Sequence, residues 1–217
     1  MAFISIENVS FTYPKAKQET IRGVSFILNK GETVALMGPN GSGKTTLGKI
    51  IARIYKPTKG KVFLCGKDIT DYTLGEVGKH IGYIFQNPEK QLFAPSVEEE
   101  ISFGLRFRGI KEEIIEKKVK EILSYFDLLP KRKSFPFNLS QGEKQRLVIA
   151  AALVMEPDFM IFDEPTIGLD MKRKKLLLKL LNSLKAHGTG YLVISHDDEF
   201  CNIAADRIMY LKDGKIT

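Results

Sequence analysis

A glycine-rich segment, GPNGSGKTT at residues 38–46, constrains the fold of this chain more than any other part of the sequence. It matches the pattern G-x-x-x-x-G-K-[ST], follows the apolar run TVALM and precedes the helical pattern TTLGKIIARIY. Glycines let backbone N–H groups converge on phosphate oxygens, and the N-terminus of the following helix adds partial positive charge. The segment therefore predicts a strand–loop–helix unit that binds phosphate. The predicted loop residues are Gly38, Asn40, Gly41, Ser42 and Gly43.

The residues after the loop carry the groups that a nucleotide phosphate requires. Lys44 supplies a full positive charge for the β- and γ-phosphates, and the hydroxyl of Thr45 is placed to bind Mg²⁺. Thr46 continues the same helical turn and is assigned to the same nucleotide site. We therefore expect ATP and Mg²⁺ at this loop.

Short apolar runs rich in β-branched residues recur along the chain and predict strands. TVALM, FMIF and YLVIS lack polar alternation, which is typical of strands covered on both faces, and helical patterns follow several of the runs. This order indicates an α/β fold with a parallel sheet. Residues 2–28 contain strands without intervening helices and predict an antiparallel β layer, whereas residues 87–137 predict a helical insertion within the same domain.

Apolar spacing predicts two long helices, at residues 111–126 and 171–186. The apolar faces would consist of Ile115, Val119, Ile122 and Phe126 in the first helix and of Leu177, Leu180, Leu181 and Leu184 in the second. The basic run Lys172–Lys175 is interpreted as a solvated helix face.

Charge and apolar content restrict the classes of protein to which this chain can belong. The net charge of +7 over 217 residues favours anionic partners, although a solvated basic surface explains it equally well. Cys65 and Cys201 have no metal-ligand spacing and are expected to be free thiols in a reducing compartment. The N-terminus has no signal-peptide pattern. The longest apolar run has nine residues, whereas a membrane-spanning helix needs about 20, so any membrane role requires a partner.

Polar groups follow two of the predicted buried strands. In FMIFDEP, Asp163 would bind Mg²⁺, and Glu164 would lie near the γ-phosphate and polarise the attacking water. An Asp–Glu pair alone is also typical of a turn or a helix cap. In YLVISHDDEF, His196 ends a strand at the same edge of the sheet, where ligands of open α/β sheets bind. We interpret His196 as a sensor of the γ-phosphate.

In this combination and order, the motifs resemble those of ATP-binding-cassette (ABC) ATPases along essentially the whole chain. The resemblance implies that Tyr13, in VSFTYP, stacks on the adenine, although a core or edge-strand tyrosine is the alternative. It implies that Gln86, in YIFQNP, reaches Mg²⁺ and the attacking water. Asp170, in TIGLD, would contact the opposite ATPase subunit.

The stretch NLSQGEKQRLVIAAALVM, residues 138–155, resembles the ABC signature and the helix that follows it. The resemblance implies that Ser140 and Gly142 bind the γ-phosphate held by a second ATPase subunit, because a helix N-terminus with a serine hydroxyl and a glycine amide suits phosphate. The segment departs from the common L-S-G-G-Q form, with Gln141 in place of the first glycine and Glu143 in place of the glutamine. The charge of Glu143 would repel phosphate unless its side chain points away.

The segment QNPEKQLFAPSVEEEISFG, residues 86–104, resembles the ATPases of energy-coupling-factor (ECF) transporters, including cobalt and nickel importers. This resemblance implies uptake of a vitamin or transition-metal ion through a transmembrane coupling protein and a substrate-binding membrane subunit. The second ATPase subunit would be either an identical or a different chain. The chain would be a single domain at the cytoplasmic face of the membrane, with a RecA-like core at 1–86 and 157–217 and a helical subdomain at about 87–156.

Two other functions remain open from the sequence. An ABC importer or exporter outside the ECF group would use the same ATP chemistry with different membrane partners. An ABC ATPase of DNA repair or translation would fit the positive charge, but it usually carries coiled-coil inserts or tandem cassettes, and neither is found in this sequence. We therefore expect no nucleic-acid partner.

Overall fold

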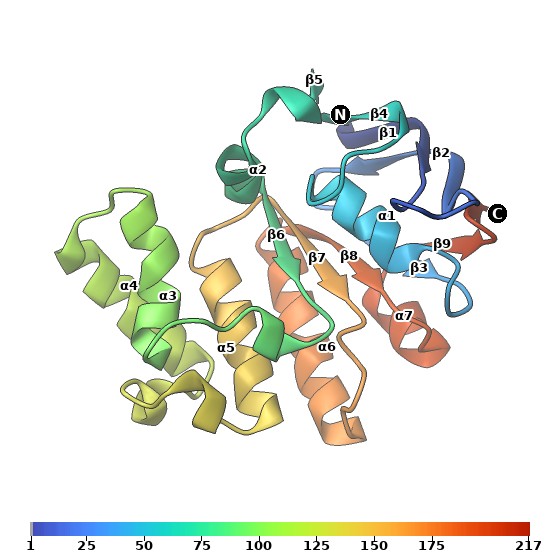
Figure 1. Ribbon diagram of the computed structural model, residues 1–217. Helices are drawn as coiled ribbons and strands as arrows, with labels where there is room; N and C mark the ends of the chain where they lie inside the picture. Colours follow the sequence, from blue (N-terminus) through green and yellow to red (C-terminus); the bar gives the residue numbers. More distant parts are fainter. Residues whose placement is uncertain (1) are drawn as a thin grey trace. The chain divides into compact units, whose positions relative to one another are not determined.

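The structure is a computed structural model in which residues 2–217 are described. Its contacts divide the chain into two units, one formed by residues 1–83 and 158–217 and the other by residues 84–157. The first unit contains both sheets, and the second is helical (Figure 1).

The antiparallel sheet of the first unit has the strand order β2–β1–β4–β5. Its strands are β1 (Ala2–Phe11), β2 (Ile21–Asn29), β4 (Lys59–Leu64) and β5 (Lys67–Asp68). Ile4 of β1 pairs with Leu28 on one side and Leu64 on the other, and all three side chains are buried. The antiparallel layer predicted from residues 2–28 therefore exists, and β4 and β5 extend it.

The second sheet has the order β10–β9–β3–β8–β7–β6, in which β9, β3, β8 and β7 pair in parallel. Its strands are β3 (Thr33–Met37), β6 (Ile81–Ile84), β7 (Phe159–Asp163), β8 (Gly190–Ile194), β9 (Arg207–Lys212) and β10 (Lys215–Ile216). Every residue of β3, β7 and β8 is buried, as the uninterrupted apolar runs predict.

The helices of the first unit are α1 (Lys44–Ile51), α2 (Leu74–His80), α6 (Met171–Ala186) and α7 (Asp198–Ala204), with a 3₁₀ turn η1 (Ile69–Asp71). Leu47, Ile50 and Ile51 of α1 join one apolar core with residues of both sheets, so α1 lies between them (Figure 1). Helices α6 and α7 pack against β8 and β3, respectively. The predicted helix at 171–186 is confirmed, whereas α2 and α7 are too short to show periodicity.

The second unit contains the helices α3 (Val97–Phe107), α4 (Glu112–Tyr125) and α5 (Gln141–Leu153) and the 3₁₀ turns η2 (Pro88–Lys90), η3 (Leu129–Lys131) and η4 (Pro136–Asn138). The helix predicted at 111–126 is confirmed as α4. Three residues of its predicted apolar face, Ile115, Val119 and Phe126, are buried, whereas Ile122 is only partly buried and the neighbouring Leu123 is fully buried. Over residues 2–217, no helix combines the length and the apolar character needed to cross a bilayer.

Candidate functional site

The loop between β3 and α1 has the backbone geometry that its glycines allow. Gly38, Gly41 and Gly43 have φ angles of 142°, 79° and 104°, a region that other residues rarely adopt. A Cβ atom on Gly38 would lie 2.0 Å from the carbonyl oxygen of Leu211, so no side chain fits there. Asn40 and Gly41 are exposed at the tip. The loop therefore presents backbone groups rather than side chains.

Two buried polar side chains line this loop. Lys44 is 5% exposed, and its Nζ donates to the carbonyl oxygens of Gly38 at 2.8 Å and Pro39 at 3.1 Å. Ser42 is also 5% exposed, and its hydroxyl has no hydrogen-bond partner among residues 2–217. A buried hydroxyl without a partner is costly, and an anion bound in the loop would supply an acceptor.

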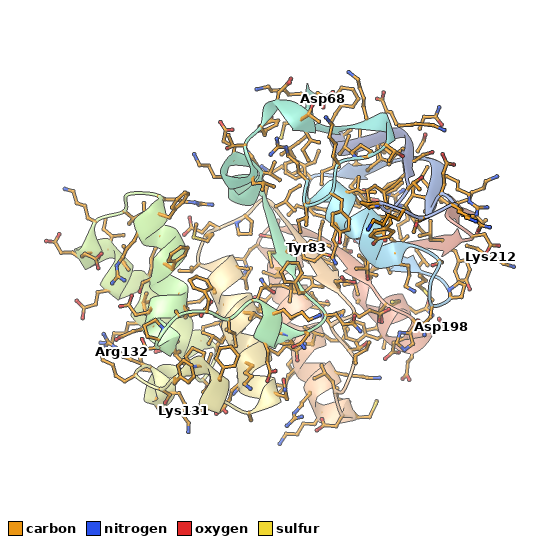
Figure 2. All side chains as sticks on the ribbon, viewed as in Figure 1. Asp68, Tyr83, Lys131, Arg132, Asp198 and Lys212 are labelled. Atoms are coloured by element: carbon orange, nitrogen blue, oxygen red, sulfur yellow. The ribbon has the colours of Figure 1, made fainter. Side chains whose placement is uncertain are left out.

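Asp163 lies at the end of β7 and is held by two hydroxyl groups from other elements. Thr45 Oγ1 donates to Asp163 Oδ1 at 2.7 Å, and Tyr83 Oη donates to Asp163 Oδ2 at 2.9 Å. Tyr83, labelled in Figure 2, comes from β6. Burial, and then the negative charge of Asp163, raises the pKa of Tyr83 far above its ordinary value, so the phenol stays a donor.

Glu164 is placed between a lysine and a histidine. Its Oε1 lies 3.9 Å from Lys44 Nζ, and its Oε2 lies 2.9 Å from His196 Nδ1. Its backbone has a φ of 51°, and its N–H donates to the carbonyl oxygen of Ile194 at 2.7 Å, which ties the end of β7 to the end of β8. The structure therefore brings Lys44, Glu164 and His196 together, as the sequence predicts for an edge where parallel strands end.

The segments around Glu164 and His196 are joined by further polar contacts. The buried hydroxyls of Thr166 and Ser195 are 3.1 Å apart. Asp197, which follows His196, caps α7 and accepts from Lys174 Nζ of α6 at 2.5 Å. Burial has the largest single effect and raises the pKa of Asp197, but the hydrogen bonds from Lys174 and from the N–H of Phe200 and the charges of Lys174 and His196 together lower it to below its ordinary value.

Asp170 and Tyr13 also belong to the first unit. Asp170 is exposed and caps α6, with Oδ1 accepting from the N–H of Arg173 at 2.8 Å. The Tyr13 hydroxyl lies 2.8 Å from Thr46 Oγ1, and its ring packs edge-to-face on Phe11. Tyr13 is 37% exposed, so the structure places it beside the glycine loop with a partly open ring.

Ser140 and Gly142 lie at the N-terminus of α5 in the second unit. Ser140 Oγ accepts from the N–H of Glu143 at 3.4 Å, and Glu143 Oε2 accepts from the N–H of Ser140 at 2.8 Å, which forms a capping box. These bonds from Ser140 lower the pKa of Glu143. Ser140 thus bonds Glu143 through both its backbone and its hydroxyl, which keeps the Glu143 carboxylate at the cap of α5.

The other replaced residue, Gln141, is also bound within this unit. Its Nε2 donates to Glu89 Oε1 at 3.2 Å, and the buried Lys144 donates to the same oxygen at 2.6 Å. The bond from Lys144 lowers the pKa of Glu89. Gln86 follows β6 and belongs to the second unit. Its role at the metal, like the roles of Ser140 and Gly142, stays a prediction.

A profile of the ABC transporter family matches residues 21–167, which include both the glycine loop and Asp163. The chain belongs to this family. It is therefore an ATP-binding subunit of a transporter, in a family that hydrolyses ATP.

ABC proteins similar to this chain include members of the ECF group. The chain is 38% identical over 218 residues to the energy-coupling factor transporter ATP-binding protein EcfA of Methanocaldococcus jannaschii, covering 100% of this chain and 78% of that protein. It superposes on cbiO1 of Clostridium perfringens, part of the ABC transporter complex cbiONQ, with a TM-score of 0.89 and 31% identity, covering 100% of this chain and 87% of that one.

A second structural relative is the ATP-binding cassette MJ0796, a dimer bound to ADP and Pi in a post-hydrolysis state. The TM-score is 0.88 at 31% identity, covering 98% of this chain and 96% of that one. With the family profile, these comparisons confirm the predicted resemblance and fold class: a P-loop parallel-sheet core, an N-terminal antiparallel layer and an inserted helical part.

The residues of this ABC site fit ATP and Mg²⁺. The open glycine backbone and the Ser42 hydroxyl suit phosphate oxygens, and Thr45 and Asp163 supply the oxygen ligands that Mg²⁺ prefers. Within the described residues 2–217, no group of three or more His, Cys, Asp or Glu side chains could hold a metal.

Tyr83 and Lys174 make contacts at the site that the sequence patterns do not predict. Tyr83 lies in one of the short apolar segments that predict strands, and Lys174 lies in the basic run interpreted as a solvated helix face. Their partners, Asp163 and Asp197, are 80 and 23 residues away in sequence. Without knowing which strands and helices are neighbours, no local pattern indicates these contacts.

Proposed function

We propose that this chain hydrolyses ATP with Mg²⁺ to power ECF-type uptake of a vitamin or transition-metal ion through partner membrane subunits. The proposed ATPase activity rests on one observation: Glu164 contacts both Lys44 and His196, beside the hydrogen-bonded pair Thr45–Asp163. The similarity to EcfA and cbiO1 supports the ECF part.

In this proposal each residue that contacts the nucleotide, the metal or the attacking water has a defined task. The loop amides and Lys44 bind the phosphates, Tyr13 stacks on the adenine, and Thr45 and Asp163 would hold Mg²⁺, which neutralises phosphate charge. Glu164 orients the attacking water and accepts its proton, while His196 orients Glu164 and contacts the γ-phosphate. Gln86 would bring a further oxygen to the metal and the water.

We also propose that two ATPase subunits share each site. Ser140 and Gly142 of one subunit would bind the γ-phosphate held by the other, and Asp170 would contact the opposite subunit. The dimeric MJ0796 structure and the position of Ser140 and Gly142 at the N-terminus of α5 support this arrangement. Glu143 and Gln141 are compatible with it because both side chains are engaged within their own unit.

An exposed aromatic surface of the second unit supports docking to a membrane protein. Phe93, Phe103 and Phe107 are 62%, 54% and 78% exposed, and the rings of Phe93 and Phe103 are 4.8 Å apart. The buried carboxylate of Glu100 accepts from the N–H groups of Phe93 and Ala94, which holds this loop on α3. Clustered exposed aromatics of this kind mark interaction surfaces. We assign this surface to the transmembrane coupling protein.

The proposal includes the domain organisation and location. The chain would act as one ABC ATPase domain, with the first unit as the RecA-like core and the second as the helical subdomain, held peripherally at the cytoplasmic face of the membrane. An ABC transporter outside the ECF group is the second candidate, because its ATP site would be the same.

Capture of the tagged chain from detergent-solubilised membranes of its host tests the coupling. We expect a transmembrane coupling protein and a small substrate-binding membrane protein to co-purify, and the double variant Phe103→Ser, Phe107→Ser to lose both while retaining ATP hydrolysis. Ile114→Ser, which changes an exposed apolar residue of α4, is the control and retains both. Unchanged capture by the double variant would refute the docking surface, and co-purification of nucleic acid alone would refute transport.

A further inference from the structure

Tyr83 contacts the functional site from the strand β6, and the proposed function gives it no task. Its hydroxyl donates to Asp163 Oδ2 at 2.9 Å, on the oxygen that Thr45 leaves free, because Thr45 binds Oδ1. Asp163 is only 2% exposed, so solvent does not supply these donors. Two hydroxyl groups therefore fix both oxygens of one buried carboxylate, and with them the orientation of its plane.

The surroundings of Tyr83 leave room for this contact. Gly48 of α1 faces it, and a Cβ atom at Gly48 would lie 3.4 Å from Tyr83 Oη and 2.6 Å from Ile194 Cδ1. The glycine lets α1, β8 and the phenol approach closely. The hydroxyl thus reaches Asp163 through a closely packed region rather than from a free surface.

We propose that Tyr83 is a positioning residue for the divalent cation of the ATP site. By occupying Oδ2, the phenol turns Oδ1 towards Thr45, so the carboxylate and the hydroxyl that would bind the cation are aligned before the cation arrives. Groups that orient metal ligands in this way commonly contribute 10- to 100-fold to metal affinity. The inference rests on the proposed role of Asp163 as a Mg²⁺ ligand.

The test compares the cation dependence of ATP binding in Tyr83→Phe and wild type. Affinity for ATP is measured in EDTA and across a Mg²⁺ titration, and bound Mn²⁺ is counted by electron paramagnetic resonance. We expect the half-saturating cation concentration to rise about 10-fold in Tyr83→Phe, with ATP affinity in EDTA unchanged. Tyr83→Met, which also lacks the hydroxyl, should give the same shift and guards against a packing defect of one variant.

Two further variants separate the possible failures. Tyr72→Phe removes another phenol hydrogen bond of the first unit, to the carbonyl oxygen of Leu64 at 3.1 Å, and should behave as wild type. Asp163→Asn should weaken cation binding more than Tyr83→Phe does. If Asp163→Asn does so and Tyr83→Phe does not, or if Tyr83→Phe weakens ATP binding equally in EDTA, the positioning role is refuted. If Asp163→Asn has no effect, the proposed metal role of Asp163 itself is refuted.

Discussion

At the scale of single residues, Glu164 carries the largest share of the proposed chemistry. It has a left-handed backbone conformation, which costs about 1–3 kcal/mol for a residue other than glycine. That conformation turns the chain at the end of β7, and the carboxylate lies between Lys44 and His196. The strain is concentrated at the residue assigned to activate water, as is common at functional sites.

The substitution Glu164→Gln tests this assignment. It retains the shape and a hydrogen-bonding oxygen but removes the base, so we expect kcat for ATP hydrolysis to fall about 10²- to 10⁴-fold. Binding of ATP should persist, because Lys44 and the loop amides are unchanged. Glu199→Gln, in the exposed first turn of α7, is the matched control and should retain wild-type turnover. Normal turnover in Glu164→Gln would contradict the assigned role.

At the scale of secondary-structure elements, α6 and α7 hold the segment that carries His196. Lys174 of α6 bonds Asp197, which both follows His196 and caps α7. The exposed fractions of the two side chains are 27% and 18%, so solvent screens the ion pair only in part. Asp170, in the segment that follows Glu164, caps the start of α6. The ion pair between Lys174 of α6 and Asp197 therefore links this segment to the one that follows Ser195.

The substitution Lys174→Met should lower the free energy of unfolding by about 1–2 kcal/mol, because a charged hydrogen bond is lost while the alkyl stem is kept. Lys175→Met, at an exposed position of the same helix, should change it by less than about 0.5 kcal/mol. Urea unfolding at neutral pH measures both. Equal effects would show that the ion pair contributes nothing specific.

The same pair predicts a dependence on pH. The pKa of Asp197 in the folded chain is below its ordinary value of 3.8, so its charge stabilises the fold above that value, and the contribution is lost as the pH falls through the folded pKa. The difference in unfolding free energy between wild type and Lys174→Met should therefore be constant above about pH 5 and shrink in acid. If the difference in unfolding free energy between the two proteins grew in acid, the assigned role of the Lys174–Asp197 pair would be contradicted.

The elements also show how far the sequence predicts the fold. The strands β3, β7 and β8 were predictable because burial on both faces leaves an uninterrupted apolar run. The glycine loop was predictable because few other structures need glycines and a lysine at the spacing G-x-x-x-x-G-K. In α4, Leu123 rather than Ile122 is fully buried, because adjacent positions of a helix differ by only about 100° and both are apolar. Contacts such as Tyr83–Asp163 depend on strand order, which local patterns do not encode.

At the scale of the whole molecule, the chain carries both halves of the proposed site on separate units. The glycine loop, Glu164 and His196 lie in the first unit, whereas Ser140, Gly142 and Gln86 lie in the second. A pair of identical copies would thus contain two complete sites, and no element would have to come from a different protein. In such a pair, Ser140 of each copy would act on the nucleotide bound by the other copy.

Mixing two inactive variants tests whether each ATP site is shared between two copies. Lys44→Ala disables the phosphate loop and Ser140→Arg disables the signature, so each should be inactive alone, while Ser140→Arg still binds ATP. In an equal mixture, half of the pairs would contain one complete site, and ATP hydrolysis should return to about a quarter of the wild-type rate. A chain with both substitutions, mixed with Ser140→Arg, forms no complete site and should stay inactive. Unchanged hydrolysis by Ser140→Arg alone, or no recovery in the mixture, would contradict a site shared between two subunits.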